Sequence, residues 1–118
     1  MPALTKVIHP VHDLAASKAV YAALLGVEPT MDESYYVGFE VGDQHLGLDP
    51  NGHRKGMTGP VGYWQVDDIE KSVQSLAEAG ATLTAESQDV GGGTQVATLT
   101  DADGNPIGLI QLTAVTRG

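Results

Sequence analysis

The chain has 118 residues, of which 42% are hydrophobic and 18% charged, a balance typical of one globular domain. The absence of cysteine excludes a disulfide framework, a thiolate metal site and a thiol nucleophile. A formal net charge of −9, with only six scattered lysines and arginines, argues against nucleic acid or an anionic membrane surface as a partner. No apolar run approaches the ~20 residues that cross a bilayer, and the first residues lack a signal-peptide pattern. We therefore expect a cytoplasmic protein with no membrane partner.

The first half of the chain predicts a strand, a helix and a hairpin. Asp13 is a suitable N-cap for a helix whose apolar residues recur at helical spacing until Gly26 stops it. A tight turn at Gly42-Asp43 joins two alternating stretches into a hairpin. A loop rich in glycine and proline then leads to the second half. The strands are expected at residues 5–11, 35–41 and 44–48, and the loop at residues 49–60.

The second half repeats the plan of the first. Val11-His12-Asp13-Leu14 returns 55 residues later as Val66-Asp67-Asp68-Ile69, again followed by a helical pattern that stops at a glycine, Gly80. Strands are expected at residues 62–66, 82–85, 94–100 and 107–112. The repeat predicts an α+β fold: a single domain, 1–118, made of two βαβββ modules at about 1–55 and 56–118. We expect their strands to form one curved mixed sheet with the helices on its outer face.

These residues resemble the vicinal oxygen chelate superfamily, which includes glyoxalase I, extradiol dioxygenases and bleomycin-resistance proteins. The resemblance spans nearly the whole chain and implies a cup-shaped sheet that holds the ligand. It also implies a homodimer, and an open sheet edge is a physical reason for two chains to pair. The residues that carry the resemblance are Pro10–Leu14, Tyr21–Gly26, Val66–Ile69 and Asp101–Leu109.

The resemblance further implies where metal-dependent members place their four ligands, which are a His or Gln on the first strand and a Glu on the last strand of each half. The corresponding residues of this chain are Lys6, Gly47, Val61 and Gly108. None of them offers a side-chain donor that suits a divalent ion. We therefore expect neither this four-ligand metal site nor a cofactor.

Candidate ligand-binding residues are those that strand alternation places beside the former ligand positions. His45 and Asp49 share a face with Gly47, and Tyr63 and Gln65 share one with Val61. Three more candidates are Lys6, which would supply the metal's positive charge, Tyr36, which would line the cup, and His53, which lies on a loop over its mouth. The steps of four between His45, Asp49 and His53 leave open a replacement metal site.

Three functions remain open from the sequence. The first, which we favour, is a small-molecule binding protein without metal, in the manner of bleomycin-resistance proteins; the acidic chain would suit a cationic or planar ligand. The second is a glyoxalase- or dioxygenase-like lyase or oxygenase whose metal is held by non-standard residues. The third is a metal-free isomerase or lyase that uses Lys6, His45 or Asp49 for proton transfer. No catalytic residue is assigned, and the identity of the ligand is not predicted.

Overall fold

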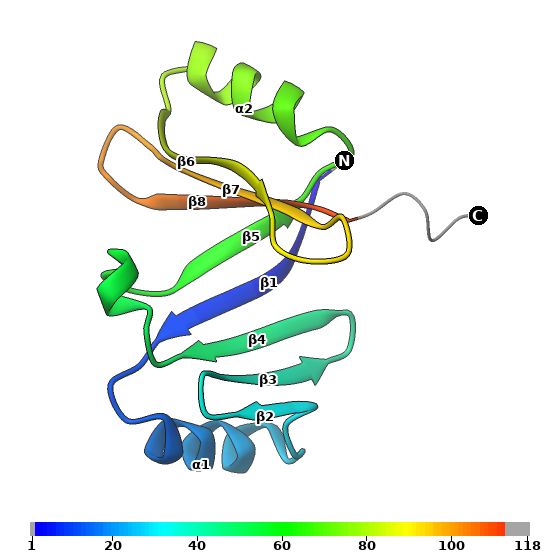
Figure 1. The fold of residues 1–118 in the computed structure, drawn as a ribbon, viewed down its shortest axis with the longest axis vertical. Helices are drawn as coiled ribbons and strands as arrows, with labels where there is room; N and C mark the ends of the chain where they lie inside the picture. Colours follow the sequence, from blue (N-terminus) through cyan, green and yellow to red (C-terminus); the bar gives the residue numbers. More distant parts are fainter. Residues whose placement is uncertain (1, 113–118) are drawn as a thin grey trace, which may run out of the picture. The chain divides into compact units, whose positions relative to one another are not determined.

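The computed structural model describes residues 2–112, and its contacts divide the chain into two compact units. The N-terminal unit is Thr5–Val61, and the C-terminal unit is Gly62–Gly118 together with Met1–Leu4. Each unit has one α-helix on one face of a mixed group of strands (Figure 1). This confirms the predicted α+β class. Neither described helix is long and apolar enough to cross a membrane.

In the N-terminal unit the first and last strands pair in parallel and the other strands pair antiparallel. The strand order is β2-β3-β4-β1. The parallel pair places Lys6 beside His45 and Ile8 beside Gly47. The elements are β1 (Ala3–Pro10), α1 (Leu14–Leu25), β2 (Met31–Glu33), β3 (Tyr36–Val41), β4 (Gln44–Asp49) and the short 3-10 helix η1 (His53–Lys55).

The C-terminal unit repeats this arrangement. Its strand order is β5-β8-β7-β6, with β5 parallel to β8 and the remaining pairs antiparallel. The order of pairing thus matches the N-terminal unit strand for strand, as the sequence repeat predicts. The elements are β5 (Val61–Gln65), α2 (Ile69–Glu78), β6 (Thr82–Asp89), β7 (Gln95–Thr100) and β8 (Pro106–Gln111).

Both helices begin at the predicted aspartates. The Asp13 carboxylate accepts a hydrogen bond from the backbone N–H of Ala16 at 3.0 Å, and Asp68 accepts one from Lys71 at 3.1 Å. These bonds satisfy backbone donors that have no partner inside the helix. Helix α1 ends at Gly26, whose φ of 70° is left-handed and favours glycine. The capping signals of the sequence therefore predicted both helix starts correctly.

Each helix covers an apolar strip of its own unit. In the N-terminal unit Val37, Phe39 and Leu48 are almost fully buried against α1. In the C-terminal unit Leu99 and Ile69 are equally buried, with Ala97 and Leu109 beside them. Because side chains alternate along a strand, burying these residues places their neighbours on the opposite face. In the N-terminal unit, the face opposite α1 carries polar side chains of β3 and β4.

His9 lies on the helix-facing side of β1. Its ring packs against Tyr21 of α1, with 5.4 Å between ring centroids. Nδ1 of this ring is buried and has no hydrogen-bond partner among the described residues. Burial lowers the pKa of this imidazole below its usual value. Burial therefore disfavours the protonated form of His9 in the folded chain.

We predict that the free energy of unfolding falls as the pH drops below about 6.5, the usual pKa of an unfolded histidine. The unfolded chain then binds a proton at His9 that the folded chain resists, so acid favours unfolding over the range between the two pKa values. Urea unfolding at pH 7 and pH 5 measures the loss, which His9→Phe should reduce. His12→Phe, which removes an exposed imidazole, is the control and should leave the loss unchanged. An equal loss in His9→Phe would contradict this account.

Candidate functional site

The face of the N-terminal unit opposite α1, here called the distal face, is where the polar residues of β3 and β4 lie. Tyr36, Gly38 and Glu40 alternate with the buried residues of β3, and His45 and Gly47 do so on β4. The hairpin register sets Gly38 opposite Gly47 and Glu40 opposite His45. The two glycines leave a space without side chains in the middle of this face.

Aromatic rings fill that space. A Cβ atom added to Gly47 would lie 1.9 Å from the Tyr36 hydroxyl oxygen, and one added to Gly38 would lie 2.7 Å from the His45 ring. Real Cβ atoms do not approach other atoms so closely. Glycine is therefore required at both positions for the two rings to lie where they do.

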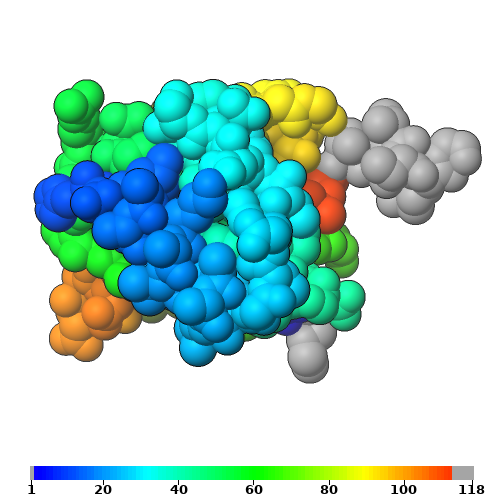
Figure 2. Space-filling view, turned by 90° about the horizontal axis from the view of Figure 1, so that it is seen from below, coloured from blue at the N-terminus to red at the C-terminus, as the bar shows by residue number. Residues whose placement is uncertain are grey.

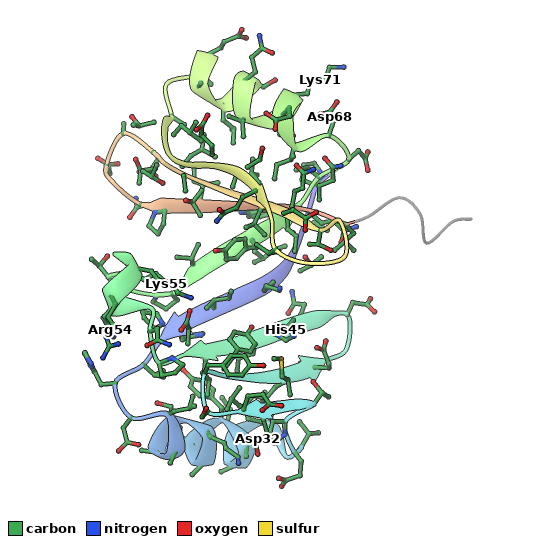
Figure 3. All side chains as sticks on the ribbon, in the orientation of Figure 1. Asp32, His45, Arg54, Lys55, Asp68 and Lys71 are labelled. Carbon is green, nitrogen blue, oxygen red and sulfur yellow. The ribbon has the colours of Figure 1, made fainter. Side chains whose placement is uncertain are left out.

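The two rings and Glu40 form a continuous hydrogen-bonded chain. Tyr36 Oη lies 2.7 Å from His45 Nε2, and His45 Nδ1 lies 2.6 Å from Glu40 Oε2. The rings are nearly parallel, with an interplanar angle of 4°. His45 is mostly buried, whereas Glu40 is about half exposed. Figure 3 labels His45 on β4. The distal face thus carries a hydroxyl, an imidazole and a carboxylate in series.

Lys6 lies on β1 directly beside His45, on the same face. Burial lowers the pKa of its ammonium group, and the negative charge of Glu40 partly opposes that shift. The fold therefore places a partly desolvated cation next to the Tyr36–His45–Glu40 chain. Such a group attracts a ligand atom that is negative or becomes so during a reaction.

Asp49 and His53, two other predicted candidates, each contact other residues: Asp49 contacts the loop that follows it, and His53 contacts His12. The buried Asp49 carboxylate accepts hydrogen bonds from Lys55 Nζ and from the backbone N–H of Asn51, both at 2.8 Å. The His53 ring stacks on His12, with 4.0 Å between centroids and an angle of 1° between planes. His45, Asp49 and His53 are therefore not brought together, and no metal-holding group of three such residues occurs between residues 2 and 112.

In the C-terminal unit the ring of Tyr63 lies over the glycine of the last strand, although Tyr63 is on the first strand of its module and Tyr36 on the third. Tyr63 of β5 is in register with Gly108 of β8, and a Cβ atom added to Gly108 would lie 2.6 Å from the Tyr63 ring. Gln65, two residues along β5, is exposed. A tyrosine ring therefore covers the glycine of the last strand in both units.

The structure also shows a hollow of about 660 Å³ that the sequence did not indicate. It lies within the C-terminal unit between α2 and the helix-facing side of β5 and β8. Trp64 lines it and is 41% exposed. Other lining residues include Lys71, Ser75, Leu76 and Leu109. Sequence reasoning missed it because a helix that stands slightly away from a sheet leaves no mark in the residue pattern.

Glu40 was also missed, although the sequence held a signal for it. The turn at Gly42-Asp43 is two residues long, and this length sets the register of a hairpin. Counting back from the turn places Glu40 directly opposite His45, as the structure shows. A carboxylate opposite an imidazole could have been identified in this way.

Two modules with this strand order are the arrangement expected for the vicinal oxygen chelate class. The chain matches the Glyoxalase/Bleomycin resistance protein/Dioxygenase superfamily over residues 4–109, and it belongs to this family. No curated protein matches the chain.

Solved structures agree with the family in fold. A glyoxalase/bleomycin resistance protein/dioxygenase superfamily member from Vibrio splendidus 12B01 has a TM-score of 0.71 at 18% identity, covering 95% of this chain and 100% of that chain. Methylmalonyl-CoA epimerase from Mycobacterium tuberculosis has a TM-score of 0.66 at 18% identity, covering 97% and 90%. The Mn(II)-bound glyoxalase from Novosphingobium aromaticivorans has a TM-score of 0.68 at 20% identity, covering 94% of this chain and 40% of that chain. At such identities the similarity shows a shared fold alone.

The family's four-ligand metal site does not fit the residues present. Its expected positions hold Lys6, Gly47, Val61 and Gly108, and tyrosine rings lie over both glycines. A glutamate side chain at Gly47 would begin inside the volume of the Tyr36 hydroxyl.

We predict that Gly47→Ala lowers the free energy of unfolding by about 1–3 kcal/mol, because the new methyl group overlaps Tyr36 and separates it from His45. Chemical denaturation measures the change. Gly59→Ala is the matched control, since a Cβ atom there would meet nothing within 4 Å. Adding Tyr36→Ala to Gly47→Ala should recover part of the loss relative to the sum of the single changes. Strict additivity would show that the two sites do not compete for space.

Proposed function

We propose that this chain is a metal-independent member of its family that binds a small molecule on the distal face of the N-terminal unit. The observation that carries the proposal is the Tyr36 hydroxyl, which lies where a metal-binding glutamate would have to start. Lys6, Tyr36 and His45 form the centre of the proposed site. Tyr63 and Gln65 remain candidate ligand-binding residues within the C-terminal unit, and Asp49 and His53 are proposed to act through the loop that follows β4.

The chemistry of the centre favours a ligand that carries an oxygen acceptor. Lys6 supplies a positive charge, Tyr36 a hydroxyl and His45 a flat ring. The net charge of −9 attracts cations to the molecule as a whole, whereas Lys6 is a local exception to this charge. A small polar or planar molecule with a carbonyl or carboxylate group suits the local charge of Lys6.

We predict that protein purified without chelators or an affinity tag contains far less than one metal ion per chain and melts at the same temperature with and without EDTA. Elemental mass spectrometry and thermal unfolding measure the two quantities. Near-stoichiometric zinc, nickel, iron or manganese would contradict the proposal and favour the metal-dependent lyase or oxygenase instead.

Ligand binding is tested with the same thermal assay on a panel of small carboxylates, ketones and planar drugs. A ligand that binds only the folded state raises the melting temperature by mass action. Tyr36→Ala and Lys6→Met should reduce this rise. Tyr35→Ala, which removes a neighbouring ring that is 58% exposed, is the control and should not. An equal effect of Tyr35→Ala and Tyr36→Ala would contradict the assigned site.

We also expect the chain to form a homodimer in which α1 takes part. This helix is apolar on nearly all sides, and Val20 and Leu24 are 63% and 72% exposed on its outer surface. Figure 2 shows that outer surface of α1 in blue. A helix that packs on one sheet needs only one apolar face. A second apolar face that is exposed favours a binding partner. A second copy of this chain carries the same apolar face and could be that partner.

The dimer is tested by light scattering after size-exclusion chromatography. Val20→Glu and Leu24→Glu should convert it to a folded monomer, because each places a charge in the contact. Val90→Glu makes the same change at an exposed valine of the C-terminal unit and should leave the dimer intact. A wild-type monomer at micromolar concentration would contradict this expectation.

A further inference from the structure

We propose that Tyr36 is a proton-transfer residue, with His45 and Glu40 as the residues that position it. In this proposal the Tyr36 oxygen removes a proton from the carbon next to a carbonyl group of the bound ligand. The chain would then be a metal-free enzyme that moves protons on enolisable carbonyl compounds. The inference rests on the proposed function, because it requires a ligand bound at the same site. It assigns a reaction to that site.

The hydrogen-bonded chain has a defined direction. A carboxylate only accepts hydrogen bonds, so His45 Nδ1 must donate its proton to Glu40 across the 2.6 Å contact. In the neutral ring Nε2 is then the acceptor, and it receives the Tyr36 O–H across 2.7 Å. The imidazole is therefore oriented to take the phenolic proton, and Glu40 stabilises the imidazolium that results. The same logic activates the hydroxyl of a serine triad.

The fold does not require this chain of residues. The C-terminal unit repeats the hairpin, and its register sets Thr98 opposite Gly108, as Gly38 is set opposite Gly47. The residues that correspond to Tyr36, Glu40 and His45 are then Val96, Thr100 and Pro106. That unit forms the same sheet with no titratable side chain at these three positions. The hydroxyl, imidazole and carboxylate are thus specific to the N-terminal unit.

Stability is a weak reason for such an arrangement. Glu40 is about half exposed, and a hydrogen bond to a carboxylate that water also reaches contributes only modestly to folding. The rings also need two glycines on adjacent strands, and glycine weakens a strand interior. A role in the reaction accounts for both features.

The reaction balances without an oxidant or a metal. The phenolic proton passes to His45 Nε2, and the Tyr36 oxygen then forms an O–H bond with the proton of the ligand. The C–H electron pair moves to the carbonyl oxygen, which becomes an enolate. Lys6, beside His45 on the same face, is the cation placed to stabilise that charge. Return of a proton to the same or the other face, or to a neighbouring carbon, completes the exchange or isomerisation.

The activation of Tyr36 is tested first, with no ligand needed. N-acetylimidazole transfers its acetyl group to phenol oxygens: the new O–C bond forms, the C–N bond breaks, and imidazole leaves with the proton. Peptide mass spectrometry should show Tyr36 acetylated faster than Tyr35, although Tyr35 is 58% exposed and Tyr36 is partly buried. The preference should disappear in Glu40→Gln and His45→Gln, with circular dichroism as the check on folding. Acetylation that follows exposure alone would overturn the inference.

The reaction itself is tested by the exchange of carbon-bound protons of pyruvate, acetoacetate and levulinate for deuterium, followed by proton NMR in D₂O. We expect the wild-type chain to accelerate exchange, Tyr36→Phe to slow it by about 100-fold or more, and Glu40→Gln to slow it without weakening binding. Tyr35→Phe is the matched control and should exchange at the wild-type rate. Probes that raise the melting temperature but exchange no faster than in buffer would overturn proton transfer and leave the binding proposal standing. Probes that neither bind nor exchange would overturn this substrate class.

Discussion

Two glycines that face each other across a hairpin, Gly38 and Gly47, are the constraint on which the distal face depends. Because neither has a side chain, the rings of Tyr36 and His45 can lie flat over the strands and meet end to end. Ordinary residues at these positions would hold both rings away from the sheet. Glu40 and Lys6 then act on an imidazole whose position is already set. The contact between the two rings thus depends on the absence of side chains at Gly38 and Gly47.

The internal repeat separates what the fold needs from what this chain adds. Both units keep a parallel pair between first and last strands, an aspartate at each helix start and an apolar strip beneath each helix. These features close a core in each unit and reflect folding requirements. The opposite faces differ: one carries a tyrosine, a histidine and a glutamate in contact, and the other a tyrosine over a glycine. Residues on the faces that do not pack against a helix can differ between the units without loss of the fold, so function can change there.

Charge on the distal face is balanced locally. Burial disfavours the charged form of the Lys6 ammonium, and the negative charge of Glu40 partly opposes this effect. Glu40 also accepts a hydrogen bond from His45 Nδ1. One exposed carboxylate therefore interacts with two cationic or potentially cationic groups. This arrangement differs from a metal centre, in which one ion of high charge would organise several carboxylates and imidazoles around itself. On the distal face the positive charge is that of the Lys6 ammonium group on β1.

Local signals in the sequence determined much of this protein. Asp13 and Asp68 mark helix starts, Gly26 marks a helix end, and the Gly42-Asp43 turn marks a hairpin, because caps and turns depend on residues a few positions apart. The repeat indicated two modules of similar plan. The family resemblance is confirmed by the family match over residues 4–109. The strand β2 (Met31–Glu33) and the short helix η1 were not predicted, since three residues carry no periodic signal and β2 exists through its pairing with β3.

Only the tertiary structure decided how the candidate residues are grouped. Strand alternation correctly placed His45 on the face of Gly47, yet spacing could not show that Asp49 turns to Lys55 or that His53 stacks on His12. It also could not show that Tyr36 occupies the space above Gly47. The Tyr36 side chain extends from its own strand to the neighbouring one, and spacing along the sequence does not indicate how far a side chain extends. The sequence alone determined which elements form and which face each residue takes, because these follow from local backbone geometry. Which side chains touch was decided by the packing of strands and loops, where distances of a few ångströms depend on all of the neighbours at once.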